Sequence, residues 1–163
     1  MPRHLEIERK FLVPRPPPGW KRRPSSRIVQ GYFPKPAKHL EIRLRQKNSQ
    51  HFITVKSGHG QSRMEEEIQI PERDFRSLWR LTREARIAKR RYEIPCDGRT
   101  IEMDVYQGSH QGLITADIEF DSVRQSHSFR VPPWLGREIT GNREYANERL
   151  ARRHGLPPKR ASN

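Results

Sequence analysis

The sequence predicts a mainly β (α+β) fold: a closed eight-stranded antiparallel β-barrel, or tunnel, with a charged lumen and a few flanking helices. Three observations lead to this fold class. Apolar residues recur at every second position in short runs, the links between runs contain turn-forming residues, and only 32% of the 163 residues are hydrophobic. Closure would remove the exposed edges of such a sheet, although an open sheet or a sandwich fits the same pattern.

The strands are expected where the alternation of apolar and polar residues is clearest. Hairpin turns are predicted at Asn48–Gln50, Gly58–Gly60 and Asp97–Arg99, whose residues favour tight turns. Loops are predicted at the proline-rich segment Pro14–Pro18 and at Phe33–Ala37. The eight predicted strands are His4–Val13, Arg27–Phe33, His39–Lys47, His51–Ser57, Ser62–Ile70, Arg86–Ile94, Thr100–Gln107 and Leu113–Ser122.

Two segments have helical spacing. In Glu72–Arg83, the apolar residues Phe75, Leu78 and Trp79 lie at i, i+3 and i+4, so they share one face of a helix. Asn142–Arg153 is predicted as a second, arginine-rich helix. We expect its charged face to lie in solvent while the helix also closes the barrel.

One domain is expected over residues 1–155, followed by a flexible tail over residues 156–163. The single cysteine, Cys96, excludes an internal disulfide and suits a reducing cytoplasm. No apolar stretch approaches the ~18–20 residues that a membrane span needs, and no signal-peptide pattern is present. We therefore expect a cytoplasmic protein with no membrane partner.

The polar faces of the predicted strands are almost purely ionic. Residues two apart in a strand share a face, and like charges at that spacing repel each other. In one strand the simple interpretation is a face turned to water. Its repetition in most strands favours ionic faces that line a lumen and bind a ligand, with the apolar faces covered by helices, loops or a partner. The same-sign pairs are Glu6/Glu8, Arg43/Arg45, Glu65/Glu67, Lys89/Arg91, Glu102/Asp104 and Asp117/Glu119.

The residue types of these faces suit a phosphate ligand and a divalent metal. Arginine binds phosphate oxygens through two parallel hydrogen bonds, lysine provides a compact charge, and carboxylates are hard oxygen ligands for Mg²⁺ or Mn²⁺. The predicted lumen cations are Lys10, Arg43, Arg45, Lys56, Lys89 and Arg91. The predicted lumen carboxylates are Glu6, Glu8, Glu65, Glu67, Glu102, Asp104, Asp117 and Glu119.

The net charge of +14 has two interpretations. An arginine-rich, solvated surface explains it without any partner. A polyanionic partner such as nucleic acid, membrane phosphate or a phosphate substrate explains it equally well.

Several short motifs, in order along almost the whole chain, resemble those of the CYTH superfamily, the triphosphate tunnel metalloenzymes. These motifs are Glu6–Phe11, Ile42–Arg45, Thr54–Lys56, Arg63–Glu67, Lys89–Arg91, Asp117–Glu119 and Arg137–Thr140 leading to Tyr145. The resemblance implies an eight-stranded tunnel, which agrees with the strand count, and it implies roles for the charged residues.

The implied roles are binding of a catalytic metal, binding of phosphate oxygens and positioning of the reacting groups. Asp117 stands where the family usually has Glu, so a water molecule could bridge it to the metal. Tyr32 could orient a nucleophile or leaving group near Lys10, or it could be a packing residue. The expected metal ligands are Glu6, Glu8, Asp117 and Glu119, and the expected phosphate ligands are Lys10, Arg43, Arg45, Lys56, Lys89 and Arg91. The expected catalytic residues are Glu6, Glu8, Lys10, Tyr32, Glu65, Glu67 and Asp104.

The resemblance implies metal-dependent hydrolysis of a triphosphate, with inorganic tripolyphosphate as the first choice of substrate and Mg²⁺ or Mn²⁺ as cofactor. Adenylate cyclase or nucleoside or thiamine triphosphatase activity on the same fold is the first alternative. A non-enzymatic module that binds polyphosphate or RNA is the second, although eight carboxylates would not help a simple anion binder. We disfavour nucleic acid as a partner and leave a homodimer open.

Overall fold

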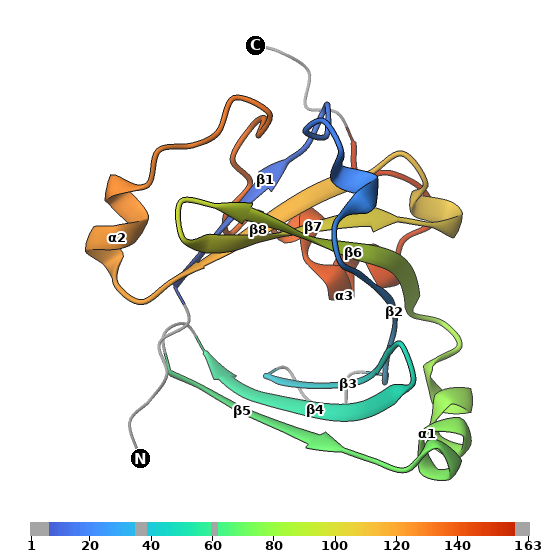
Figure 1. The fold of residues 1–163 in the computed structure, drawn as a ribbon. Coiled ribbons are helices and arrows are strands. Elements are labelled where there is room, and N and C mark those ends of the chain that lie inside the picture. The colour runs from blue at the N-terminus through green and yellow to red at the C-terminus, as the bar shows by residue number, and fades with distance from the viewer. Residues whose placement is uncertain (1–6, 35–38, 60–61, 159–163) are drawn as a thin grey trace.

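The computed structural model describes residues 7–34, 39–59 and 62–158, and they form one strongly curled antiparallel sheet (Figure 1). The strand order is β1-β8-β7-β6-β2-β3-β4-β5. Eight antiparallel strands with a few short helices confirm the predicted mainly β class. The strands are β1 (Ile7–Leu12), β2 (Ser25–Tyr32), β3 (Leu40–Lys47), β4 (Gln50–His59), β5 (Ser62–Gln69), β6 (Arg86–Cys96), β7 (Arg99–Tyr106) and β8 (Ile114–Phe120).

The predicted closure of the barrel is wrong, because β1 and β5 are the two edges of the sheet among the described residues. One edge of β1 pairs with β8, and its other edge is already used by the chain around Glu138. There the amide N of Leu12 donates to the carbonyl of Arg137 at 2.9 Å, and the amide N of Ile139 donates to the carbonyl of Lys10 at 2.8 Å. These bonds occupy part of the free edge of β1, and among the described residues β5 does not pair with that edge.

The two tight hairpins between β3 and β4 and between β6 and β7 agree with the predicted turns. Asn48 has a φ of 54°, Asp97 a φ of 46° and Gly98 a φ of 73°. These left-handed conformations suit asparagine, aspartate and glycine. The predicted turn at Gly58–Gly60 includes residues outside the described part of the chain.

The two predicted helices both exist, but each is interrupted. The first is α1 (Glu72–Trp79), continued by the 3₁₀ turn η2 (Arg80–Thr82). The second divides into η4 (Arg143–Tyr145) and α3 (Asn147–Ala151), because Ala146 is extended, with a ψ of 136°. Three further short helices were not predicted from the sequence: η1 (Trp20–Arg22), η3 (Gly108–His110) and α2 (Val123–Ser128). Pro157 is buried, although it belongs to the segment predicted to be a flexible tail.

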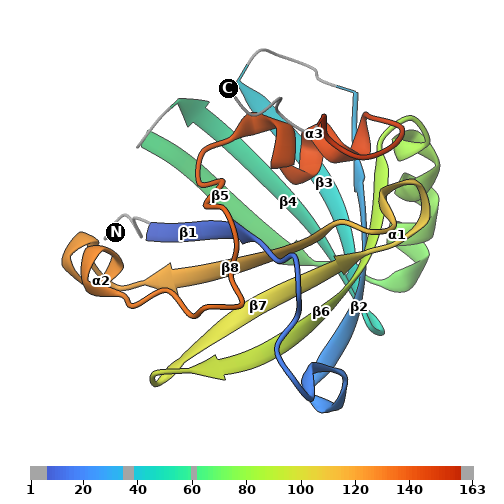
Figure 2. The same cartoon turned by 90° about the horizontal axis from the view of Figure 1, so that it is seen from above.

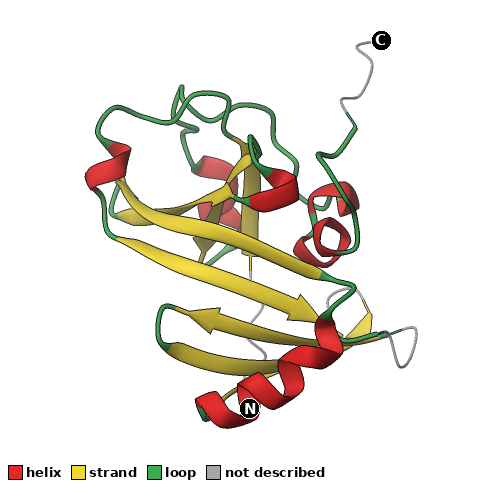
Figure 3. Ribbon diagram, turned by 90° about the vertical axis from the view of Figure 1, so that its right-hand side faces the viewer, coloured by secondary structure: helices red, strands yellow, loops and turns green. Residues whose placement is uncertain are grey.

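Chain segments cover much of the convex face of the sheet, while Met64 and Ile68 of β5 stay exposed on it. α1 lies outside the sheet (Figure 3). Its Phe75 packs against His51 of β4, with 4.6 Å between the ring centroids. Phe129, which follows α2, packs 5.4 Å from Phe120 of β8. A first hydrophobic core on this face includes Phe11, Val13, Ile94, Ile101, Met103, Ala116, Ile118, Phe120 and Leu135. Since the apolar residues point outward under this cover, the alternate, ionic residues point to the concave side.

A second core lies at one end of the concave side, where α3 packs against the strands (Figure 2). It joins residues of the C-terminal helical segment to buried residues at the ends of three strands, β2, β6 and β7. Its buried members are Tyr32, Ala85, Ile87, Tyr106, Leu113, Ile139, Tyr145, Leu150 and Ala151. The expectation that the C-terminal helix closes one end of the curled sheet is therefore met by its apolar residues.

Gly31 of β2 is a point of very close packing against the helical segment that follows β5. An added Cβ would lie 2.3 Å from Thr82 Oγ1 and 2.7 Å from the ring of Trp79. We expect Gly31→Ala to lower the free energy of unfolding by about 1–3 kcal/mol, the usual cost of overpacking. Urea unfolding would measure it. Ser25→Ala, at an exposed position of the same strand, is the control and should stay within about 0.5 kcal/mol. Equal stability of both variants would contradict this packing.

Candidate functional site

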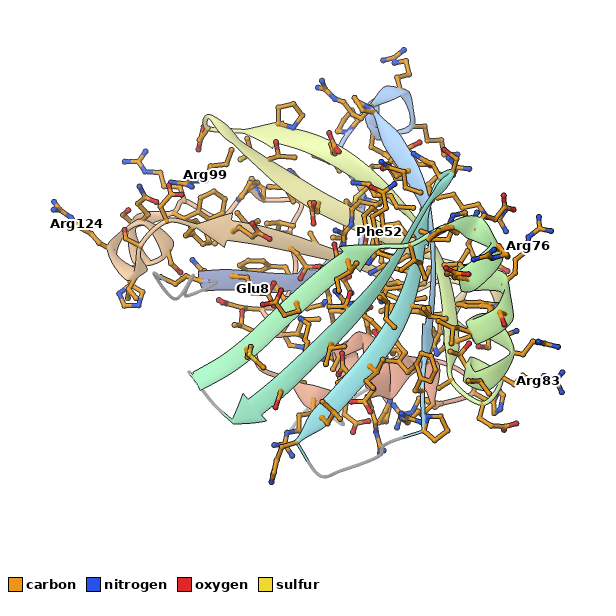
Figure 4. The ribbon with its side chains drawn as sticks, turned by 90° about the horizontal axis from the view of Figure 1, so that it is seen from below. Glu8, Phe52, Arg76, Arg83, Arg99 and Arg124 are labelled. Carbon is orange, nitrogen blue, oxygen red and sulfur yellow. The ribbon has the colours of Figure 1, made fainter. Side chains whose placement is uncertain are left out.

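Antiparallel register brings ionic side chains from seven strands, all except β2, together on the concave side. Cross-strand partners include Lys10 with Asp117, Glu102 with Asp117, Arg91 with Asp104, Lys56 with Glu65, and Thr54 with both Arg43 and Glu67. Glu8 of β1, labelled in Figure 4, pairs with Glu119 of β8. Glu6 lies outside the described residues.

The first group of charges lies on β3, β4 and β5. Lys56 Nζ is 2.8 Å from Glu65 Oε2, whereas Arg43 Nη2 lies 3.7 Å from Glu65 and 3.8 Å from Glu67. Arg45 Nη1 lies 3.7 Å from Glu67, which also accepts a 2.8 Å hydrogen bond from buried Thr54. The arginine pairs are too long for hydrogen bonds, so these guanidinium groups can take up phosphate oxygens without first losing strong bonds.

The second group, on β6 and β7, is tightly bonded and buried. The side chains of Lys89 and Asp104 are both 0% exposed, with Nζ 2.6 Å from Oδ2. Arg91 donates to the same carboxylate through Nε at 2.8 Å and Nη2 at 2.9 Å, and it also donates to Glu102. Asp104 thus accepts three charge-assisted hydrogen bonds, which anchor two cations in a fixed geometry.

Burial and charge act against each other in this second group. Burial lowers the pKa of Lys89 to about 8, although the charge of Asp104 acts to raise it. Burial alone would raise the pKa of Asp104, but the charges of Lys89 and Arg91 and their hydrogen bonds hold it well below its usual range. Asp104 is therefore ionised at neutral pH, and its carboxylate is a poor proton acceptor.

A third group of carboxylates lies on β7 and β8 beside β1. A hollow is lined by Glu102, Asp117, Glu119 and Asp121, together with the segment around Arg99. Lys10 Nζ lies 3.2 Å from Asp117 Oδ1, yet this buried oxygen accepts no hydrogen bond from the described residues. A buried carboxylate oxygen with unused lone pairs is the donor that a hard divalent cation takes. Within the described ranges, no group of three acidic, histidine or cysteine side chains converges as a complete metal site.

Tyr32 is a packing residue whose hydroxyl also reaches the polar side chains beside Arg45. Its side chain is only 2% exposed and belongs to the second core. Its hydroxyl accepts a 3.0 Å hydrogen bond from Gln30, which in turn accepts one of 3.3 Å from Arg45. Burial raises the pKa of Tyr32 to about 12, against the opposing charge of Arg43, so the hydroxyl stays protonated near neutral pH.

Sequence reasoning missed several residues of the concave side. Glu41 shares a face of β3 with Arg43, so the period of two already pointed to it. Burial, and next the charge of Glu148 in α3, raise the pKa of Glu41. Gln30 and Thr54 were not predicted, because they are uncharged and the prediction used pairs of charged residues. Asn147 of α3 reaches the second group from a separate element, which strand periodicity cannot predict.

Four arginines outside the three groups lie on two sides of the molecule. Figure 4 shows Arg76 and Arg83 at α1 on one side of the molecule, and Arg99 and Arg124 on the opposite side. A dispersed arrangement fits a solvated arginine-rich surface better than one extended groove for a long polyanion. In the part of the chain that the structure describes, no helix has the length and apolar character of a membrane span.

A strongly curled eight-stranded sheet whose concave side gathers cations against carboxylates defines a class of polyanion-binding β proteins. Residues 4–152 match the family model described as the CYTH domain, and the chain belongs to this family, as the motifs had indicated.

Relatives and solved structures agree with this assignment. The chain is 42% identical over 148 residues to an inorganic triphosphatase of Nitrosomonas europaea, covering 90% of this chain and 96% of the relative. It is 34% identical over 117 residues to an inorganic triphosphatase of Acetivibrio thermocellus, covering 71% and 74%. The crystal structure of an inorganic triphosphatase superposes with a TM-score of 0.74 at 38% identity, covering 92% of this chain and 96% of that one.

Proposed function

We propose that the protein is a metal-dependent triphosphatase that hydrolyses inorganic tripolyphosphate on the concave side of its sheet. The observation that carries the proposal is the convergence there of phosphate-binding cations and metal-binding carboxylates from separate strands. Two relatives that cover most of this chain are named inorganic triphosphatase, which supports the same substrate.

The cations have different parts in the proposal. Arg43, Arg45 and Lys56 bind phosphate oxygens directly. Arg45 and Lys56 are partly exposed, and the carboxylates nearest Arg43 and Arg45 are 3.7–3.8 Å away. Lys10 and Arg91 bind from the opposite half of the sheet. Lys89 was expected as another direct ligand, but it is fully buried, so we assign it a supporting charge behind Arg91 and Asp104.

The metal is proposed to bind through Glu6, Glu8 and Glu119, with Asp117 as a direct or water-bridged ligand. All are carboxylates, the ligand type that Mg²⁺ and Mn²⁺ prefer, and the buried Oδ1 of Asp117 fits such a role. When bound, the metal would offset the charge of the triphosphate and lower the pKa of a coordinated water.

The carboxylates of β5 are the proposed residues for positioning the attacking water. Glu65 and Glu67 are 32% and 37% exposed and lie beside the proposed phosphate ligands. Asp104 was a candidate for the same role, but it is buried and accepts three hydrogen bonds, so we assign it to anchoring Lys89 and Arg91.

The positions of the tryptophans favour a substrate without a base. Trp20 packs against Tyr92 outside the sheet, Trp79 stacks on Phe75, and Trp134 packs against the first core. None of the three is placed to stack on a nucleobase in the concave side. The cyclase and nucleotide-hydrolase alternatives therefore rank below inorganic tripolyphosphate, and the dispersed surface arginines rank RNA binding lower still.

The test compares tripolyphosphate, ATP, thiamine triphosphate and long-chain polyphosphate, each with Mg²⁺, Mn²⁺ or EDTA. We expect fastest phosphate release from tripolyphosphate with metal and none in EDTA. Arg43→Ala should raise KM and lower turnover, while Arg124→Ala, an exposed arginine of α2, should match the wild type. Binding without any phosphate release, or cyclic nucleotide formation from ATP, would overturn the proposal.

Activity should respond to pH through Lys89. Its pKa of about 8 means that the ammonium loses its proton as pH rises through that value, which removes positive charge from behind the phosphate site. We expect KM for tripolyphosphate to rise several-fold between about pH 7.5 and 9. Lys89→Arg keeps its charge over this range and should lose this step. Substrate ionisation is common to both proteins, so identical KM profiles would contradict the assignment.

The cytoplasmic location and the homodimer are predictions from the sequence. The thiol of Cys96 is unpaired and half-buried, in keeping with the reducing cytoplasm that we expect. The homodimer stays open.

A further inference from the structure

Asn147, the first residue of α3, connects the C-terminal helix to the buried cations. Its Oδ1 atom accepts a 2.8 Å hydrogen bond from the hydroxyl of Tyr106 and a 3.3 Å hydrogen bond from Nζ of Lys89. The Lys89 ammonium also lies 5.3 Å from the centre of the Tyr106 ring. Thus two of the three N–H donors of Lys89 point to two oxygens, one from β7 and one from α3.

The amide orientation of Asn147 is determined by its partners. An ammonium can only donate, and the Tyr106 hydroxyl donates here, so the amide must present its oxygen to both. Burial raises the pKa of Tyr106 well above its ordinary value, which keeps that hydroxyl a donor. The reversed amide would place N–H groups against a buried positive charge.

The usual local role of asparagine at a helix start does not explain this residue. Asparagine is favoured as an N-cap, but the N-cap of α3 is Ala146, and no side chain caps this helix. By contrast, Asn142 does cap, since its Oδ1 accepts the amide N–H of Glu144 at the start of η4. Two asparagines of one segment therefore have different tasks.

We propose that Asn147 is a positioning residue for the phosphate site: it holds the Lys89 ammonium in the orientation in which Lys89 and Arg91 share Asp104. This proposal rests on the proposed function. The proposal gives α3 a part in phosphate binding, because Oδ1 of Asn147 is an acceptor for Lys89 that lies outside the strands. Arg91 donates to the same carboxylate as Lys89. The orientation of Lys89 therefore affects substrate binding through the position of Arg91.

The first test is a double-mutant cycle on tripolyphosphate hydrolysis with Mg²⁺. Asn147→Leu should lower kcat/KM by about 10-fold, mainly through KM, because a hydrogen bond to a charged group is lost. Asn147→Asp keeps the acceptor oxygen and should restore most of the activity. In a Lys89→Met background, Asn147→Leu should have little further effect, because the partner of Asn147 is already gone.

Asn142→Ala is the matched control. It removes a cap from the same segment and should lower thermal stability without changing KM. Two results would overturn the proposal, because they would mean that Asn147 only stabilises the helix. The first is an equal loss of kcat/KM from Asn147→Leu in the wild-type and Lys89→Met backgrounds. The second is a rise in KM from Asn142→Ala as large as that from Asn147→Leu.

A readout without substrate separates this proposal from the proposed function. In protein labelled with ¹⁵N-lysine, the hydrogen-bonded ammonium signal of Lys89 is identified by its loss in Lys89→Met. We expect this signal to shift or exchange faster in Asn147→Leu and to stay unchanged in Asn142→Ala. An unchanged signal in Asn147→Leu overturns the contact even if the protein hydrolyses tripolyphosphate. A changed signal supports it even if another triphosphate proves to be the substrate.

Discussion

Replacing Asp104 with leucine is expected to lower the free energy of unfolding by about 3–5 kcal/mol, the largest stability loss we expect from one substitution. The carboxylate is fully buried and accepts hydrogen bonds from Lys89 and Arg91. Leucine has the same branched shape as aspartate but is bulkier, so the substitution leaves no cavity. The loss arises because Lys89 remains fully buried without its counter-charge, while Arg91 keeps only its pair with Glu102.

Urea unfolding measures this loss directly, and the midpoint of thermal unfolding should fall by roughly 6–20 °C in a domain of this size. Combining Asp104→Leu with Lys89→Met removes one stranded charge and should recover part of the stability. Asp121→Asn, at a carboxylate that is 85% exposed, is the control and should change stability by less than about 0.5 kcal/mol. A double variant no more stable than Asp104→Leu would argue against the buried pair.

Asp104 should also affect how the free energy of unfolding depends on pH in acid. Because the folded-state pKa of Asp104 lies below its ordinary value, its contribution to stability is complete above about pH 4 and declines as pH falls further. In Asp104→Leu this part of the acid dependence should be absent.

The largest effect on activity is expected at the carboxylates of β1 and β8. Glu8→Gln and Glu119→Gln keep the size of the side chain but remove the negative charge of a proposed metal ligand. We expect each to reduce metal-dependent turnover at least about 100-fold while the fold is retained. Glu6→Gln should behave in the same way, and Lys56→Ala and Arg43→Ala should weaken both binding and turnover.

Two measurements check this expectation. Turnover is followed against Mn²⁺ concentration, and Mn²⁺ binding is measured without substrate by its paramagnetic resonance signal. Glu66→Gln is the matched control, because Glu66 is exposed and alternates with the inward-pointing carboxylates of β5. If the glutamine variants at Glu8 and Glu119 keep both the wild-type rate and the wild-type Mn²⁺ affinity, the proposed metal site is wrong.

Much of the architecture could be predicted from the order of residue types along the chain. Alternation with a period of two located all eight strands to within a few residues and separated the apolar faces from the ionic ones. Asn48 and the pair Asp97–Gly98 identified two hairpin turns through their tolerance of positive φ. The same period placed Arg43, Arg91 and Asp117 on the side where the structure finds them.

Closure of the sheet could not be predicted in this way. Residues 136–140, from a distant part of the chain, pair with Lys10 and Leu12 at the free edge of β1, and β5 is the other edge of the described sheet. The interruption of the C-terminal helix at Ala146 has a similar origin. It allows Tyr145 and Leu150 to enter the second core while Asn147 reaches Lys89.

The sequence by itself therefore determined which side chains share a face, because a strand alternates its side chains whatever surrounds it. Only the tertiary structure decided how those charges are divided between loosely paired, partly exposed groups and fully buried, tightly bonded ones. That division depends on desolvation and on the distances between groups from separate elements. Arg43 and Lys89 look equivalent along the chain. Arg43 lies 3.7–3.8 Å from its carboxylates, whereas Lys89 is enclosed by Asp104, Tyr106 and Asn147 and bonded to Asp104 at 2.6 Å.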